Sequence, residues 1–217
     1  AFNSRVVLDQ VPAEGIRSLA PIDLVYARNM GYVIKLLAIA RRTPEGVDIR
    51  VHPTMIPSAH PLAGVNDVYN AIYVVGDAVG ETMFFGEGAG SLPAASAVVG
   101  DVIEVARHYT SGCLGFEGCT CVEDLPVRDM GDLSTRYYIR LGVADQPGVL
   151  AATSRVFADY DVSLASVMQP EVGDGGDAEL VYVTHAASEK AVRGALNDIG
   201  ALQVVRSVGA VIRVEDF

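Results

Sequence analysis

Lysine, tryptophan and cysteine are scarce in this sequence of 217 residues. It has no tryptophan, three cysteines, and 16 lysines and arginines against 27 aspartates and glutamates, which gives a net charge of −11. Lys35 and Lys190 are its two lysines. Because nucleic-acid phosphates are held by clustered Lys and Arg side chains, this balance argues against a nucleic-acid partner.

Long apolar runs are also missing. No stretch reaches the roughly 20 apolar residues of a membrane-spanning helix, and no basic and then apolar segment opens the chain. Half of the residues are hydrophobic and a fifth are charged, as in ordinary globular proteins. We therefore expect a soluble, cytoplasmic protein with no membrane partner and with one large or two modest domains.

The cysteines Cys113, Cys119 and Cys121 all lie in CLGFEGCTC. An odd number in one short loop is a poor disulfide framework. A zinc site needs about four ligands, and His108 is the nearest residue that could complete one. The sequence favours three reduced thiols in a connector and no metal site.

Residues 110–134 show neither helical nor strand periodicity and are rich in Gly, Cys, Asp and Ser. This composition predicts a linker between a first domain at 1–109 and a second at 135–217.

The first domain has mixed α+β patterns. A short helix at 21–30 ends at Gly31, and the continuous apolar run at 32–42 is typical of a strand covered on both faces. Two β-rich runs around Gly76-Asp77 predict a hairpin over 70–85, and a helix follows at 93–109. We expect these strands to form one mixed sheet.

The second domain has the order βαββαβ, which is the ferredoxin-like arrangement. One antiparallel sheet should carry both helices on one face, and its other face needs a cover, usually a second copy of the domain. The expected elements are strands at 137–143, 162–169, 178–186 and 204–215 and helices at 147–160 and 188–200.

Gly86, Gly88 and Gly90 stand between an apolar run and an Ala-rich helical pattern, which is the outline of a phosphate-binding turn. A dinucleotide fingerprint, however, follows the first strand of a βαβ unit. Here the glycines come late and no second parallel strand follows, so this is not that fingerprint. The alternative is a turn kept small for packing alone.

Pro147 and Gly148 open a helix directly after a strand, so the first N–H groups of that helix lack partners and attract a carboxylate. Asp145 could meet an ammonium group and Ser163 could add a hydroxyl contact. Together they would suit a free amino acid. The alternative is that Asp145 only caps the helix.

The pattern D-x-P-G-V-L, followed by a helix and a strand ending at Gln169, resembles the ACT domain over residues 135–217. That resemblance implies an α+β, ferredoxin-like module that binds amino acids at this turn, often across a dimer interface. Many members carry Asn where this chain has Asp145 and Ser163. The matching positions are Asp145, Gln146, Gly148, Val149 and Ser163.

The first half and the last strand resemble the homoserine dehydrogenase family. The resemblance rests on GYVIKLLAIARR, VHPTMIPSAHPLAGVNDVYNAIYV, GDAVGETMFFGEGAGSLPAASAVVGDVIEVAR and VVRSVGAVIRVED. It implies the C-terminal fragment of an NAD(P)-dependent oxidoreductase of threonine and methionine biosynthesis, which interconverts L-aspartate 4-semialdehyde and L-homoserine.

The same resemblance assigns Gly90 to the cofactor contact and makes threonine the expected effector. It also implies a homo-oligomer, a dimer or tetramer formed through the mixed sheet and the ACT domain. Neither Lys35 nor Lys190 occupies the family's catalytic position. We therefore expect no catalytic residue in this chain, no NAD(P) bound to it alone, and no activity of the isolated fragment.

Two other readings compete. A stand-alone ACT-type module could sense an amino acid and act through a partner. A hydrolase is disfavoured because the sequence has no G-x-S-x-G elbow and its cysteines share a loop without a paired base. The four histidines, His52, His60, His108 and His185, are isolated along the chain.

Overall fold

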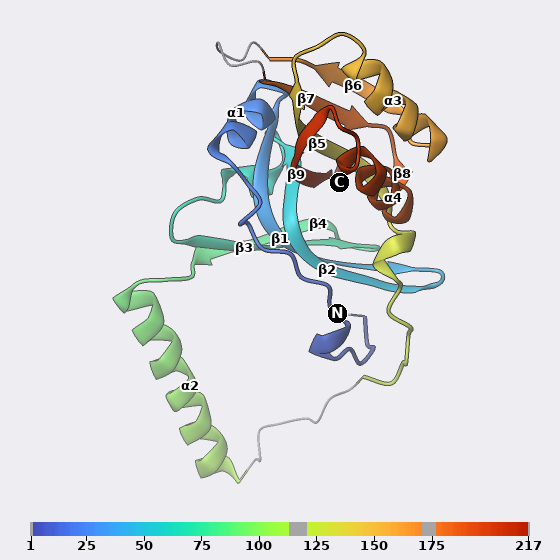
Figure 1. The fold of residues 1–217 in the computed structure, drawn as a ribbon. Helices are drawn as coiled ribbons and strands as arrows, with labels where there is room; N and C mark the ends of the chain where they lie inside the picture. The colour runs from blue at the N-terminus through green and yellow to red at the C-terminus, as the bar shows by residue number, and fades with distance from the viewer. Residues whose placement is uncertain (1, 113–120, 171–176, 217) are drawn as a thin grey trace. The chain divides into compact units, whose positions relative to one another are not determined.

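Residues 2–112, 121–170 and 177–216 are described by the computed structural model, which divides the chain into two units (Figure 1). Unit 1 comprises Ala1–Pro57 and Asp124–Phe217, and unit 2 comprises Ser58–Glu123. Unit 1 thus takes residues from both sides of the expected linker. The division into units therefore does not mark the expected domain limits, which stay a prediction.

The second half of the chain forms the predicted βαββαβ unit. Its four main strands are antiparallel neighbours in the order β9-β5-β7-β6, and a short strand β8 (Ala187–Ser188) pairs with β5. No element bound differs from the prediction by more than three residues, so the ferredoxin-like fold is confirmed. The elements are β5 (Ser134–Ala144), α3 (Val149–Asp159), β6 (Leu164–Met168), β7 (Asp177–Thr184), α4 (Glu189–Gly200) and β9 (Val205–Val214).

Two strands of the first half extend this sheet. Helix α1 (Pro21–Asn29) ends before Gly31, whose φ is +82°, and is followed by the antiparallel hairpin of β1 (Tyr32–Thr43) and β2 (Gly46–Pro57). Strand β2 then pairs in parallel with β9 at only two positions. Among the described residues the result is a seven-stranded mixed sheet (Figure 1). Six strands follow the path β1-β2-β9-β5-β7-β6, and β8 is the seventh, paired with β5. A mixed sheet is thus present, but the expectation that all strands of the first half share one sheet is wrong, because only β1 and β2 belong to it.

Two details of the first half differ from expectation. Strand β1 is the outer strand of the sheet and is not covered on both faces, since Leu36 is 55% exposed. Strands β3 (Tyr69–Gly76) and β4 (Gly80–Glu87) pair with each other in a separate two-stranded sheet of the described chain. A continuous apolar run does not distinguish an inner strand from an outer one, because the neighbours of a strand are set by distant residues.

The main sheet has an apolar layer on each face. On one face, residues such as Ile139, Leu141 and Tyr182 pack with Phe157 of α3 and Ile199 of α4. On the other face the cluster consists of Ala27, Met55, Tyr138, Val181, Ala210, Ile212 and Val214. The sequence suggested that a second copy of the domain usually covers this face. Because Ala27 belongs to α1, the same chain covers at least part of it.

Unit 2 contains the predicted hairpin and helix. Strands β3 and β4 meet at Gly76 and Gly80, and the rings of Tyr69 and Phe85 stack with centroids 4.8 Å apart. Helix α2 (Ser91–Ser111) ends at Gly112, whose φ is +66°. Across the described residues, no helix combines the length and the apolar character needed to cross a membrane. Short 3-10 helices occur at η1 (Leu8–Gln10), η2 (Pro61–Gly64) and η3 (Met130–Asp132).

A buried carboxylate fixes α1 to the sheet. Asp23, which is fully buried, accepts hydrogen bonds from Arg140 Nε at 2.7 Å and from Tyr138 Oη at 2.8 Å. Arg140 also bonds Glu179 on β7, and Glu179 accepts from Tyr26 of α1. Burial, and next the hydrogen bond to Asp23, raise the pKa of Tyr138 above its usual value. These side chains therefore form one connected hydrogen-bond network between α1 and the sheet.

A second charged cluster surrounds the end of β9. Arg213, 4% exposed, donates to Glu189 at the start of α4 at 2.6 Å and to Glu14 at 2.9 Å. Hydrogen bonds from Arg213 lower the pKa of Glu14, and they lower that of Glu189 against the opposing effect of burial. Since Glu14 precedes α1, this cluster ties the start of the chain to the ferredoxin-like unit.

Replacing Asp23 with alanine should lower the free energy of unfolding by about 3–5 kcal/mol, because Arg140 would keep only the partly exposed Glu179 and Tyr138 would lose its acceptor. The measurement is urea unfolding followed by far-UV circular dichroism. The control is Asp159→Ala, which breaks the exposed Arg155–Asp159 pair and should cost less than about 0.5 kcal/mol. Equal losses in the two variants would contradict the role assigned to Asp23.

Acid should weaken the fold through His52. Burial lowers the pKa of His52, and the positive charges of Arg213 and Arg50 lower it further, from an ordinary value of 6.5. The unfolded chain therefore takes up a proton first as the pH falls below 6.5, so stability is present above that pH and is lost as the pH falls towards the folded pKa.

The test is the urea midpoint measured between pH 7.5 and 5.5. It should fall with pH in the natural chain and fall less steeply in His52→Gln. The same slope in both chains would exclude His52 as the cause.

Candidate functional site

A pocket of about 220 Å³ lies in unit 1 at the turn between β5 and α3. Its lining consists of residues 143–150, Gln169 after β6, and Leu180 on β7. Of the predicted ligand-binding residues, Asp145, Gln146, Gly148 and Val149 line this pocket, whereas Ser163 does not. The role of all five in binding stays a prediction.

The chain direction at this turn depends on Gly148. Its φ is +92°, a left-handed conformation that glycine adopts without strain, and it is the N-cap of α3. The first bond within the helix runs from Ala152 N to Gly148 O at 2.9 Å. The N–H groups of Val149 and Leu150 therefore come before the helical hydrogen bonds begin and carry the positive end of the helix dipole.

Asp145 does not cap α3. The N-cap is Gly148, and no side chain of the described residues makes a capping hydrogen bond there. Asp145 is exposed within the pocket lining. The alternative that this carboxylate serves only as a helix cap is therefore wrong, which leaves the side chain available to a ligand.

The pocket combines two kinds of surface. Val143, Val149 and Leu180 belong to the core and supply an apolar base, while Asp145 and Gln169 supply polar groups. A negative carboxylate and a positive helix end in one small pocket match the two charges of a free amino acid. Of this base only Val149 was predicted from the sequence; Leu180 was not, because it comes from a strand about thirty residues away.

The glycine turn lies in unit 2. Gly90 is the N-cap of α2 with φ +131°, so its backbone requires glycine whether or not a cofactor is present. A Cβ on Gly88 would overlap the Asn70 side chain, whereas nothing lies within 4 Å of a Cβ on Gly86. Packing therefore explains Gly88, and the cofactor contact of Gly90 stays a prediction.

The remaining candidate residues form no further site among the described residues. No group of three or more His, Cys, Asp or Glu in that part of the chain is placed to hold a metal ion. Cys121 is exposed, and Cys113 and Cys119 lie outside the described residues. Lys35 is half-buried on β1 and Lys190 is exposed on α4.

Comparison with known families assigns both halves. Residues 1–103 match the family model described as homoserine dehydrogenase, and residues 137–201 match the ACT domain model. The chain is 40% identical over 216 residues to the homoserine dehydrogenase of Helicobacter pylori and 43% identical over 224 residues to that of Mycobacterium tuberculosis. These alignments cover 100% and 99% of this chain and 51% of each relative.

Solved structures of homoserine dehydrogenases are also similar to this chain. A homoserine dehydrogenase from Thiobacillus denitrificans superposes with a TM-score of 0.85 at 39% identity, covering 99% of this chain and 50% of that one. The Staphylococcus aureus homoserine dehydrogenase at pH 7.0 gives 0.63 at 29% identity, covering 100% of this chain and 50% of that one.

The fold and the two matches define an ACT domain that follows a domain of the homoserine dehydrogenase family. The chain is homologous to the C-terminal part of homoserine dehydrogenases. It spans about half the length of the curated relatives that it matches.

Replacing Gly148 with alanine should destabilise unit 1 by about 1–2 kcal/mol, because the left-handed conformation strains any residue with a Cβ. No atom lies within 4 Å of that Cβ, so the loss would come from the backbone alone. Gly15→Ala is the control, since Gly15 has equal space and no left-handed φ. Urea unfolding of the two variants checks this, and a neutral Gly148→Ala would contradict it.

Proposed function

We propose that this chain is the part of a homoserine dehydrogenase that completes the catalytic and dimerising region and carries a regulatory amino-acid site. The whole protein would interconvert L-aspartate 4-semialdehyde and L-homoserine with NAD(P), on the route to threonine and methionine. Similarity along the entire chain to half of each relative supports this assignment.

Catalysis by the whole protein would need parts that these residues do not supply. Hydride transfer requires the nicotinamide to be held against the aldehyde carbon and a proton donor for the developing alkoxide. Gly90 is the position proposed to contact the cofactor, and neither lysine matches the family's catalytic one. On this proposal the chain by itself binds no NAD(P) and does not turn over substrate.

The ACT domain would bind an amino acid, and threonine is the effector that we propose. The observation that supports this step is that Asp145 and the first residues of α3, Val149 and Leu150, line one pocket. The ligand carboxylate would accept from Val149 and Leu150, and its ammonium group would meet Asp145. A volume of about 220 Å³ lies below the roughly 300–1,000 Å³ typical of pockets for drug-sized ligands, as suits a smaller ligand.

A homo-oligomer, a dimer or tetramer formed through the mixed sheet and the ACT domain, completes the proposal. Strands β1 and β6 are the two outer strands of the main sheet, and each offers a row of backbone groups to a second copy.

Titration calorimetry of the 217-residue chain with L-threonine should show saturable binding. Asp145→Ala should weaken it at least tenfold, since a lost charge-assisted hydrogen bond is worth about 1.5–3 kcal/mol and tenfold is about 1.4. Asp159→Ala, an exposed carboxylate on α3 outside the pocket lining, is the matched control and should bind like the natural chain.

Absence of threonine binding, with another amino acid binding in an Asp145-dependent way, would refute threonine and keep the site. Equal binding by both variants would refute the site.

The isolated chain should show no NAD(P)H oxidation with L-aspartate 4-semialdehyde, because it lacks the groups that position the nicotinamide. The measurement is absorbance at the nicotinamide band, with a full-length relative as the positive control. Turnover above the enzyme-free rate would overturn this part of the proposal.

A further inference from the structure

The edge of β2 that faces away from β1 is covered by separate segments. Val47 exchanges backbone hydrogen bonds with residues 126–128, and Val51 does so with residues 12–14. Ile49 lies between them, and its N–H and C=O face the same edge because alternate residues of a strand do so. No backbone partner among the described residues meets Ile49 at this edge.

Arg50 adds unsatisfied donors nearby. Its side chain is 2% exposed, its Nε donates to His52 at 3.2 Å, and its Nη2 donates to Glu215 at 2.6 Å. Its Nη1 is buried and has no hydrogen-bond partner among the described residues. Buried N–H groups without an acceptor are rare in native proteins, because their loss of hydration is not compensated.

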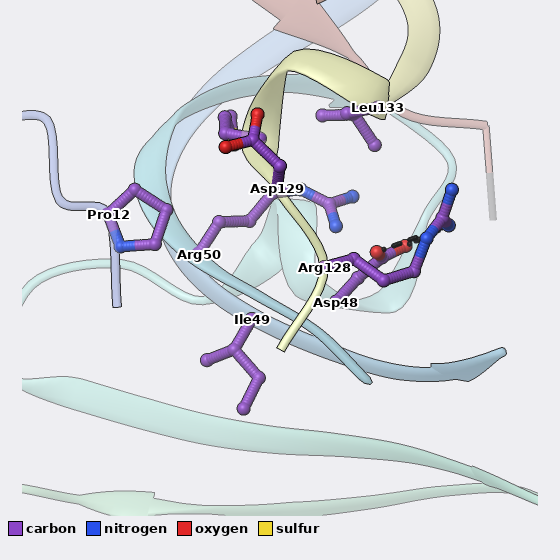
Figure 2. A pocket seen from close by; sticks show the side chains of 8 residues that line it. Pro12, Asp48, Ile49, Arg50, Arg128, Asp129 and Leu133 are labelled. Carbon is purple, nitrogen blue, oxygen red and sulfur yellow. Dashed lines mark hydrogen bonds and ion pairs between the residues drawn. The ribbon is translucent and has the colours of Figure 1, made fainter. Parts of the chain in front are cut away.

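Ile49 and Arg50 both line one small, half-open cavity in unit 1, which we name the β2 cavity. Its volume is about 10 Å³, close to the space that one water molecule needs. Figure 2 shows the Arg50 side chain extending into it below the segment that carries Arg128 and Asp129. The lining residues are Pro12, Asp48, Ile49, Arg50, Arg128, Asp129, Met130 and Leu133.

We infer that the β2 cavity is the binding site of a single structural water molecule. The water accepts a hydrogen bond from Arg50 Nη1 and exchanges hydrogen bonds with the backbone of Ile49. Its remaining proton is available to the carboxylate of Asp48 or Asp129, which gives it the two to four polar partners of a well-held buried water.

The charges around the cavity favour water over an ion. An anion would meet the carboxylates of Asp48 and Asp129 as well as the Ile49 carbonyl, and a halide is larger than water. A cation would face the Arg50 guanidinium. Water is the species of this size that both donates and accepts.

The site adds a contact between two parts of the chain whose backbones, within the described residues, pair beside it only at Val47. Residues 128–133 lead into β5 of the ACT domain, while Ile49 and Arg50 belong to the homoserine dehydrogenase domain. The water therefore bridges the entry to the ACT domain and strand β2.

A crystal structure of the 217-residue chain grown in sodium bromide tests the inference directly. We expect a density peak at about 2.7–3.2 Å from Arg50 Nη1 without an anomalous bromide signal. A bromide signal at that position would show an anion site and overturn the inference, and so would a cavity without density.

Water cross-peaks to the Ile49 amide in rotating-frame NMR spectra test it in solution at a pH where the guanidinium protons of Arg50 and Arg128 exchange slowly, since no lining residue carries a hydroxyl. The natural chain should show the cross-peak, and Arg50→Lys should lose it. Arg41→Lys is the matched control, because Arg41 also pairs with Glu215 but does not line the cavity.

Retention of the cross-peak in Arg50→Lys, or its loss in both variants, would contradict the assignment. If Arg50→Lys does not fold, the natural chain alone decides by the presence or absence of the peak.

Discussion

The ion pair between Asp23 and Arg140 is the contact on which the shared core of this protein depends. It lies between a helix of the homoserine dehydrogenase domain and a strand of the ACT domain, and it is almost fully removed from water. In any other orientation of α1 the fully buried Asp23 carboxylate would lose both Arg140 and Tyr138, so α1 packs on the sheet in the orientation that keeps these contacts. The apolar cluster of Ala27 and Tyr138 then forms around it.

Elements that are determined by residues close together in the sequence were predicted correctly. The order and bounds of the ferredoxin-like elements were predictable because hydrophobic periodicity and turn residues act within about ten neighbouring positions. The hairpin at Gly76 and the helix after Gly90 were predictable for the same reason. At each of these elements the local sequence pattern and the tertiary packing favour the same secondary structure.

The contacts between residues far apart in the sequence could not be predicted. The pairing of Thr54 with Arg213 joins strands almost 160 positions apart, and no local pattern encodes it. The buried position of Arg50 is another case, since arginine is ordinarily exposed and becomes buried only when acidic partners such as Glu215 come from elsewhere in the chain. At the candidate pocket, the turn from Asp145 to Val149 could be recognised in advance, whereas Leu180 could not.

The position of β9 has a consequence for how the chain is made. Although it is the last strand in the sequence described, it lies inside the sheet, between β2 and β5. During synthesis the hairpin of β1 and β2 must therefore wait for a neighbour that leaves the ribosome about 150 residues later, after the whole of unit 2 has appeared. Such late closure of distant segments slows folding and lengthens the time during which strand edges are exposed to other molecules. A chain shortened before Val205 would lose an interior strand and, with it, the backbone pairing that joins β2 to the ferredoxin-like unit.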